Sequence, residues 1–128
     1  MSDYKADQIK VLEKANGEVI TRVAFDQWAV QLLLGDSLLI VEGKWQFIDV
    51  KGHVLDQDVD LEDRSSFLLW RAVGQTVTRI SVFESPHSNL EIVLSSGCRL
   101  LVYGDDDDYE DWTFSGHGSN IVCMGKFY

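Results

Sequence analysis

The sequence has little proline, cysteine or positive charge, and each shortage excludes some classes of protein. Pro86 is the only proline in 128 residues of which 45% are hydrophobic, so the composition is that of a globular domain. Cys98 and Cys123 are far apart and form no CxxC pair, which excludes a disulfide scaffold and predicts two buried thiols. No apolar run approaches the roughly 20 residues of a membrane helix, and the N-terminus lacks a signal peptide's apolar stretch. We expect one cytoplasmic domain, residues 1–128, that makes no membrane contact.

Positive charge is scarce, and the imbalance lies in the second half of the chain. Eleven Lys and Arg residues stand against 21 Asp and Glu residues, which gives a net charge of -10. Residues 1–55 carry eight acids and six bases, whereas residues 56–128 carry thirteen acids and five bases. Phosphate contacts require a basic surface, so no nucleic-acid partner is expected.

Three blocks of the sequence recur in the same order, which indicates an internal repeat. The first block is GEVITRV and returns as GQTVTRI, and the last is a Trp-x-Phe motif. The blocks pair residues 17–23 with 74–80 at an offset of 57, 28–41 with 90–103 at 62, and 45–47 with 112–114 at 67. We predict two units, approximately 3–55 and 60–118, followed by a strand over 119–128 that pairs with the second unit.

Each unit is predicted to begin with a helix and to continue with short antiparallel strands. Residues 4–16 and 60–74 carry apolar stripes and end at a glycine, which favours helices. The strands alternate apolar and polar residues between short turns such as Gly35-Asp36. The predicted class is therefore α+β, with two αβββ units whose strands form one continuous or two packed antiparallel sheets and a helix against one face. A small β-barrel or roll is the alternative.

The run GDDDDYED at 104–111 is the most unusual segment. The first unit closes the equivalent connection with a short turn, so folding does not require the run, and crowded carboxylates repel one another. It fails the EF-hand pattern at Tyr109 and Glu110, and no metal site is predicted. A solvated loop is the simplest alternative to a binding role. The residues predicted to bind a partner are Asp105, Asp106, Asp107, Asp108, Tyr109, Glu110, Asp111 and Trp112.

A second acidic stretch precedes the second predicted helix and is expected to extend the same surface. Asp56, Asp58 and Asp60 alternate with other residues, which is also typical of an edge strand with one charged face. Glu62 and Asp63 suit a helix N-terminus, where the helix dipole favours anions. These local explanations stand beside the binding role that we predict for the three aspartates.

No motif in the sequence indicates catalysis, so no catalytic residue and no cofactor is predicted. The three histidines, His53, His87 and His117, are separated from one another, and neither HExxH nor GxSxG is present. The tryptophans occupy repeat positions or an apolar helix face, which predicts that they pack in the core. Trp112 and Tyr109 are exceptions, because an aromatic beside carboxylates suits a partner that brings Arg or Lys.

The pattern GxxVTR, then LEIVLSSGCRLLVY, then YEDWTF resembles small bacterial immunity proteins of polymorphic-toxin or contact-dependent growth-inhibition systems. The resemblance implies a cytosolic, non-catalytic protein that binds and blocks a cognate toxin domain. A nuclease toxin must present a basic cleft to phosphates, and an acidic protein can fill that cleft. We therefore expect an immunity protein whose partner is a basic toxin domain. The alternatives are an acidic protein-interaction module of another role and a small metal- or ligand-dependent enzyme.

Overall fold

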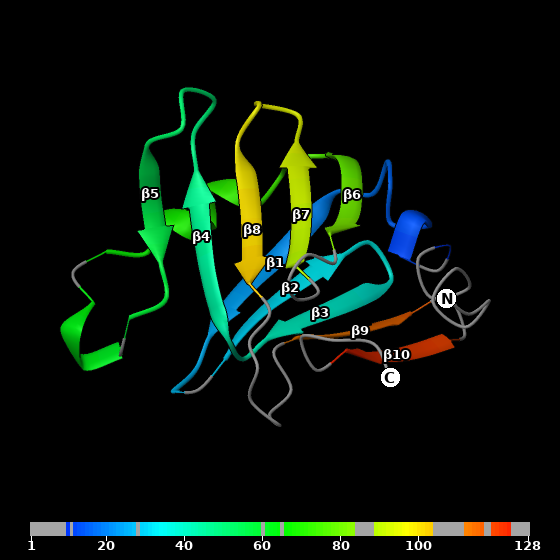
Figure 1. The fold of residues 1–128 in the computed structure, drawn as a ribbon, viewed down its shortest axis with the longest axis horizontal. Coiled ribbons are helices and arrows are strands. Elements are labelled where there is room, and N and C mark those ends of the chain that lie inside the picture. Colours follow the sequence, from blue (N-terminus) through cyan, green and yellow to red (C-terminus); the bar gives the residue numbers. More distant parts are fainter. Residues whose placement is uncertain are drawn as a thin grey trace.

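The protein folds as two five-stranded antiparallel sheets that face each other (Figure 1). The computed structural model describes residues 10, 12–27, 29–59, 61–64, 66–83, 89–103, 112–116 and 119–123. The first sheet contains, in order across the sheet, β1 (Ile20–Phe25), β2 (Val30–Leu34), β3 (Ser37–Val41), β9 (Trp112–Gly116) and β10 (Ser119–Cys123). The second contains β5 (Val54–Gln57), β4 (Lys44–Ile48), β8 (Arg99–Tyr103), β7 (Asn89–Leu94) and β6 (Val77–Phe83).

The predicted α+β class is wrong, although the neighbouring strands are antiparallel as expected. The segment predicted as the second helix forms two short 3-10 helices instead, η1 (Leu61–Asp63) and η2 (Leu68–Ala72). The buried residues of η2, Leu69 and Ala72, are three apart, which matches the three-residue turn of a 3-10 helix. In the first predicted helix, Lys10, Leu12 and Glu13 are helical and a turn follows, while most of its other residues lie outside the described ranges.

The two sheets correspond strand for strand. Starting from β1, the first sheet runs β1-β2-β3-β9-β10, and starting from β6 the second runs β6-β7-β8-β4-β5. The register shifts between Ile20 and Arg22 in β1, and between Val77 and Arg79 in β6. Each sheet therefore combines three successive strands from one half of the chain with two from the other half. The division into two units stays a prediction, but β4 and β9 each pair outside the unit in which the sequence places them.

Reciprocal hydrogen bonds join the beginnings of the two corresponding halves. The N–H of Gly17 donates to the carbonyl of Val77 over 2.7 Å, and the N–H of Gly74 donates to the carbonyl of Ile20 over 2.7 Å. Gly17 and Gly74 are 57 residues apart, and so are Ile20 and Val77, which is the offset that the sequence repeat gives for this block. Further along, Leu34 and Leu94 pair with Ile20 and Val77, so the structural offset there is 60 and the predicted 62 is wrong.

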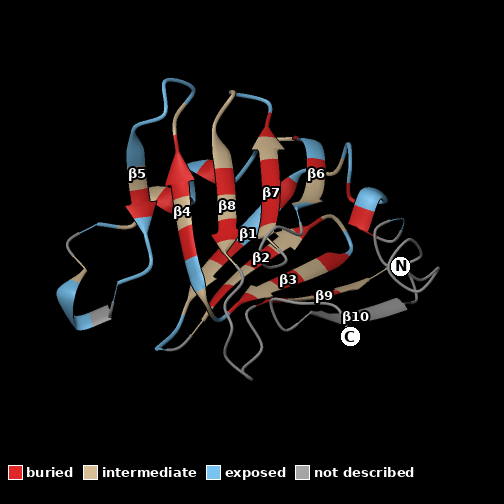
Figure 2. Cartoon of the chain, in the orientation of Figure 1, coloured by how far each residue is buried: buried red, intermediate tan, exposed pale blue. Residues whose placement is uncertain are grey.

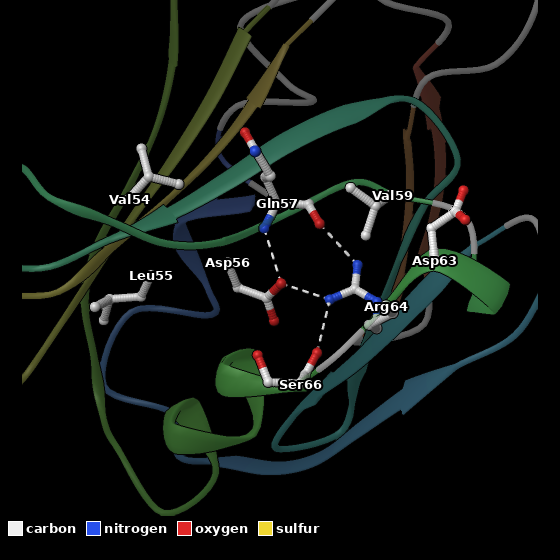
Figure 3. A pocket seen from close by; sticks show the side chains of 8 residues that line it. All are labelled: Val54, Leu55, Asp56, Gln57, Val59, Asp63, Arg64 and Ser66. Atoms are coloured by element: carbon white, nitrogen blue, oxygen red, sulfur yellow. Dashed lines mark hydrogen bonds and ion pairs between the residues drawn. The ribbon is translucent and has the colours of Figure 1, made fainter.

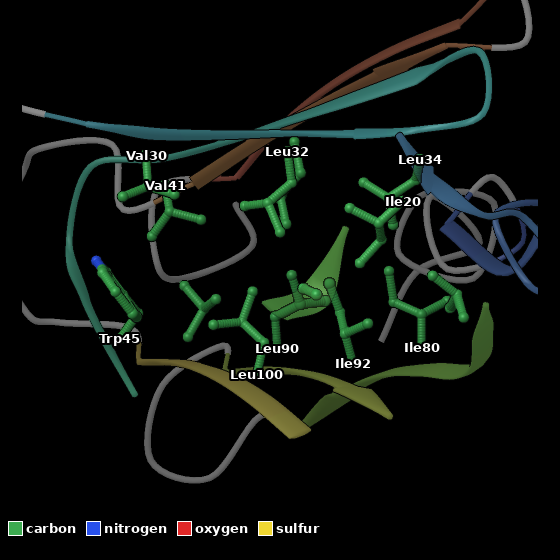
Figure 4. Close-up of a cluster of buried hydrophobic side chains, with 14 of the residues drawn as sticks. Ile20, Val30, Leu32, Leu34, Val41, Trp45, Ile80, Leu90, Ile92 and Leu100 are labelled. Atoms are coloured by element: carbon green, nitrogen blue, oxygen red, sulfur yellow. The ribbon is translucent and has the colours of Figure 1, made fainter. Parts of the chain in front are cut away.

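The core lies between the sheets and is built from alternate residues of their strands (Figure 2). In β2, β3 and β8 buried and half-buried residues alternate, as expected for strands with one face inward. Figure 4 shows aliphatic side chains of the two sheets meeting between them. The largest fully buried side chains include Phe47, Trp112 and Phe114. None of the helices among the described residues is long and apolar enough to cross a membrane.

The C-terminal strand pairs partly as expected. Residues 119–123 form β10, which pairs with β9 from Ser119 opposite Gly116 to Cys123 opposite Trp112. Residues 124–128, which complete the predicted strand, lie outside the described residues. Through β9 the strand extends the sheet of β1, β2 and β3, and β9 fills the place that β4 takes in the other sheet.

Candidate functional site

The strands that flank the acidic run end at the same corner of the molecule. The run itself, with Asp105 to Asp108, Tyr109, Glu110 and Asp111, lies outside the described residues, as does Asp60. Before it, Tyr103 pairs with Lys44 at the start of β4. After it, Trp112 pairs with Val41 at the end of β3. Only Glu42 and Gly43 separate β3 from β4, so both flanking residues lie beside this one turn.

Acidic residues are concentrated in the segments that join strands at this corner. The segments are 26–29, 42–43, 58–67 and 104–111, and they contain twelve of the 21 acids of the chain but a single base, Arg64. The described acids among them are exposed. We call the acids of these four segments the acidic end, and those that the structure describes are Asp26, Glu42, Asp58, Glu62 and Asp63. The hairpin turns at the opposite strand ends, 35–36 and 49–53, hold only Asp36 and Asp49 together with Lys51.

Asp56, predicted to bind a partner, is instead buried and holds the fold together (Figure 3). One of its oxygens accepts a hydrogen bond from the Arg64 guanidinium, and the other accepts from the backbone N–H of Leu69 over 2.9 Å. The first oxygen also accepts from the N–H of Gln57 over 2.8 Å. The carboxylate therefore links β5 to η2 and is not available to a partner.

Of the predicted site residues that the structure describes, only Asp58 is exposed. Its Oδ1 accepts the N–H of Trp45 over 3.0 Å, and its own N–H donates to the Trp45 carbonyl over 3.2 Å. Trp112 is fully buried, and its Nε1 has no hydrogen-bond partner. The expectation that Trp112 contacts a partner is therefore wrong, because its place in β9 turns its ring into the core.

An aromatic cluster around Arg64, which sequence reasoning missed, lies next to the acidic end. The cluster comprises Phe25, Trp45, Phe67 and Trp70. The guanidinium carbon of Arg64 lies 4.9 Å from the ring centroid of Phe25 and 5.5 Å from those of Trp45 and Phe67. The sequence contained one signal for this cluster. Arg64 is the single base in an acidic stretch, and a base that pairs with a neighbouring carboxylate can be buried.

Hydrogen bonds hold the Arg64 side chain in place in addition to its contacts with the aromatic rings. Its side chain is only 3% exposed. Beyond its contact with Asp56, it donates to the carbonyl of Gln57 over 2.7 Å and to that of Ser66 over 3.3 Å (Figure 3). The only base in these segments is therefore paired with Asp56 inside the fold. It does not neutralise the exposed carboxylates of the acidic end.

One residue of the aromatic cluster, Trp70, is exposed to solvent. The sequence predicted core positions for the tryptophans other than Trp112. Trp45 is buried in the core, whereas Trp70 is 54% exposed and Trp28 lies outside the described residues. The Trp70 ring stacks on Phe67 with centroids 5.1 Å apart and planes 20° apart. Its Nε1 donates to the carbonyl of Val23 over 3.1 Å. The indole is thus held in one orientation with part of its surface open.

A hollow of about 230 Å³ lies beside Arg64 (Figure 3). It is lined by Val54, Leu55, Asp56, Gln57, Val59, Asp63, Arg64 and Ser66. Its buried charged groups, Asp56 and Arg64, bind each other. Among the side-chain atoms of the lining residues, only the Nε of Arg64 is buried without a hydrogen-bond partner. The hollow therefore offers a ligand little charge that the fold does not already use.

The remaining polar groups of the described residues serve turns and sheet faces. Asp49 accepts the N–H groups of His53 and Lys51, each over 2.9 Å, and lies 3.2 Å from the His53 ring. The backbone hydrogen bond from His53, more than that from Lys51 or the contact with the ring, lowers the pKa of Asp49 below its ordinary value. Glu91 bridges Arg79 and Arg99 across β6, β7 and β8. Within the described ranges, no group of three His, Cys, Asp or Glu side chains could hold a metal ion.

Comparison with known proteins gives a family without an assigned activity. The model of a family of unknown function, DUF6188, matches residues 11–126, which is nearly the whole chain. No curated protein and no solved structure matches the chain.

Proposed function

Because the chain belongs to the DUF6188 family, whose function is unknown, we propose from its own residues that it is a cytoplasmic immunity protein. In this proposal it binds a basic toxin domain, such as a nuclease, with its acidic end and thereby neutralises it. The observation that carries the proposal is the segregation of charge. Segments that meet at one corner hold most of the acids of the chain, and their single base is buried against Asp56 and three rings.

The segregation has a direct physical consequence for binding. Charges of one sign that gather on one side create a field which orients a basic partner before contact and raises its association rate. A nuclease must carry basic groups in its cleft to hold phosphates, so its cleft is a suitable target. An acidic protein docked there blocks the access of the nucleic acid without doing any chemistry.

The carboxylates stabilise the complex more than they stabilise the fold. Glu62 and Asp63 are exposed, so their mutual repulsion in the free protein costs stability that a basic partner would recover. Asp58 differs, because its carboxylate also closes β5 onto β4 through the N–H of Trp45. Substitutions that test binding should therefore spare Asp58 and Asp56.

The test uses two variants that each remove three negative charges. The first carries Asp105→Asn, Asp106→Asn and Asp107→Asn. The matched control carries Glu13→Gln, Glu18→Gln and Asp36→Asn. Glu13 and Asp36 are exposed, Glu18 is half-buried, and all three lie toward the opposite strand ends. The partner is the basic toxin domain encoded beside the gene. Binding is measured by calorimetry, protection by bacterial growth on co-expression, and integrity of the fold by urea unfolding.

We expect the first variant to bind the toxin domain about tenfold or more weakly and to protect poorly, because the charges that steer and complement the partner are gone. The control should bind and protect as the unaltered protein does. Equal binding by the two variants would remove the acidic end from the mechanism. A gene neighbourhood without a toxin, combined with tight binding to another basic protein, would favour an acidic interaction module of a different role.

A further inference from the structure

Trp70 is a large aromatic side chain that remains exposed on the surface after folding. It is 54% exposed, although three other rings pack within the same cluster. Its orientation is nevertheless fixed by the hydrogen bond from Nε1 to the Val23 carbonyl and by stacking on Phe67. An aromatic ring that is already held in place loses little conformational entropy on binding, which is the property of an anchor residue.

The surroundings of Trp70 indicate what it can receive. Val73 is 45% exposed and follows Trp70 by three residues at the end of η2, so the two lie on the same side of this 3-10 helix. Phe25 lies 6.1 Å from the Trp70 ring and immediately precedes Asp26 of the acidic end. Arg71 is also exposed, but it is the neighbour of Trp70 in the helix and points to another side. The exposed indole therefore lies against Phe25, whose chain neighbour is the Asp26 carboxylate of the acidic end.

We propose that the exposed part of the Trp70 indole binds an arginine side chain of the basic partner. The inference rests on the proposed function for the identity of the partner, but the site itself rests on the ring and its charged neighbours. Arg64 shows that a guanidinium suits this cluster, since it lies over the rings of Phe25, Trp45 and Phe67. A second guanidinium on Trp70 would have an aromatic surface beneath it and carboxylates of the acidic end near it.

Arginine fits this place better than lysine or an aliphatic side chain. The guanidinium is planar, stacks on an indole and is weakly hydrated, whereas the ammonium of lysine holds its water strongly. An aliphatic side chain would gain the same apolar contact but nothing from the neighbouring carboxylates. The negative charge of the acidic end therefore favours a cationic side chain. The flat indole ring favours the planar guanidinium over the ammonium of lysine.

The experiment follows the indole N–H resonance of Trp70 by nuclear magnetic resonance while capped hexa-arginine is added to the full chain. Capped hexa-lysine and a capped neutral Gly-Ser hexapeptide are the comparison probes. Trp70→Phe identifies the resonance by its loss, and Trp70→Ala removes the aromatic surface. Phe83→Ala is the matched control, because Phe83 is 51% exposed but lies at the end of β6 and outside the cluster.

We expect hexa-arginine to shift the Trp70 resonance more than hexa-lysine does and the neutral peptide to leave it unchanged. Trp70→Ala should weaken hexa-arginine binding about two- to fivefold, the effect of one exposed cation–π contact, while Trp70→Phe retains most of the affinity and Phe83→Ala all of it. An unmoved Trp70 resonance, an equal response to the neutral peptide, or equal losses in Trp70→Ala and Phe83→Ala would each overturn the proposal.

The outcomes for the two proposals can be told apart with the toxin domain. If Trp70→Ala binds the toxin domain normally while the Asp105 to Asp107 variant fails, the immunity function stands and the arginine site is wrong. If hexa-arginine moves the Trp70 resonance but no toxin domain is neutralised, the arginine site stands and the proposed function is wrong.

Discussion

Replacing Arg64 by alanine should strongly destabilise the protein. The substitution leaves the Asp56 carboxylate, 6% exposed as a side chain, buried without its cation. Removal of one partner from a buried ion pair typically costs about 3–5 kcal/mol. The guanidinium also lies over three rings, whose contacts are lost at the same time. Since a domain of this kind is stable by roughly 5–15 kcal/mol, the loss should be a large fraction of the total.

The measurement is urea unfolding followed by far-ultraviolet circular dichroism, because tryptophan fluorescence would respond to the altered surroundings of Trp45. Arg79→Ala is the matched control. Arg79 pairs with Glu91 over 3.4 Å, but its side chain is 64% exposed and Glu91 keeps Arg99 at 3.0 Å. Its loss should cost less than about 1 kcal/mol, as for other surface ion pairs. Equal costs for the two variants would refute the reasoning that Arg64 is a buried structural cation.

Three further changes test other parts of the fold. Ser37→Ala should raise the free energy of unfolding by about 1 kcal/mol in urea titrations, because the buried Ser37 hydroxyl has no partner, and a loss of stability would contradict this. Gly116→Ala should lower it by about 1–3 kcal/mol, since Gly116 has a φ of 156° and an added Cβ would lie 2.7 Å from the Cα of Ser37; an unchanged unfolding midpoint would disprove the crowding. The pKa of Asp49 should lie below 3.8 in a carbon-detected titration, so the group stabilises the fold above its unfolded-state pKa and that contribution disappears as the pH falls through the lower folded-state pKa. Asp49→Asn should remove this acid-dependent part, and a measured pKa at or above 3.8 would contradict it.

The strands could be predicted from the sequence because their cause is local. Apolar residues alternate with others through β2, β3 and β8, and alternation decides which side chains face the core. The partner of a strand is not a local property, however. The Trp-x-Phe motifs of β4 and β9 mark equivalent strands, but nothing in their pattern indicates that each joins the other half of the chain.

The candidate site was predictable only in its charge. Counting acids gives the sign and the excess of the second half, and the topology then brings the strand ends that these segments connect to one corner. The individual residues failed where tertiary contacts override local pattern. Asp56 resembles its exposed neighbour Asp58 in sequence, yet the N–H of Leu69 and the guanidinium of Arg64 bury it. Trp70 looks like a core residue of an amphipathic helix, but η2 has a three-residue period and leaves it on the surface.

The dependence of the toxin association rate on ionic strength tests the central claim most directly. The rate should be measured by stopped flow between low and physiological salt for the unaltered chain, the Asp105 to Asp107 variant and the Glu13, Glu18, Asp36 control. If the acidic end steers the partner, the unaltered chain and the control should slow steeply and equally with salt. The Asp105 to Asp107 variant should start slower and depend on salt less. A common slope for all three proteins would show that the placement of the charge does not matter, and would contradict the account.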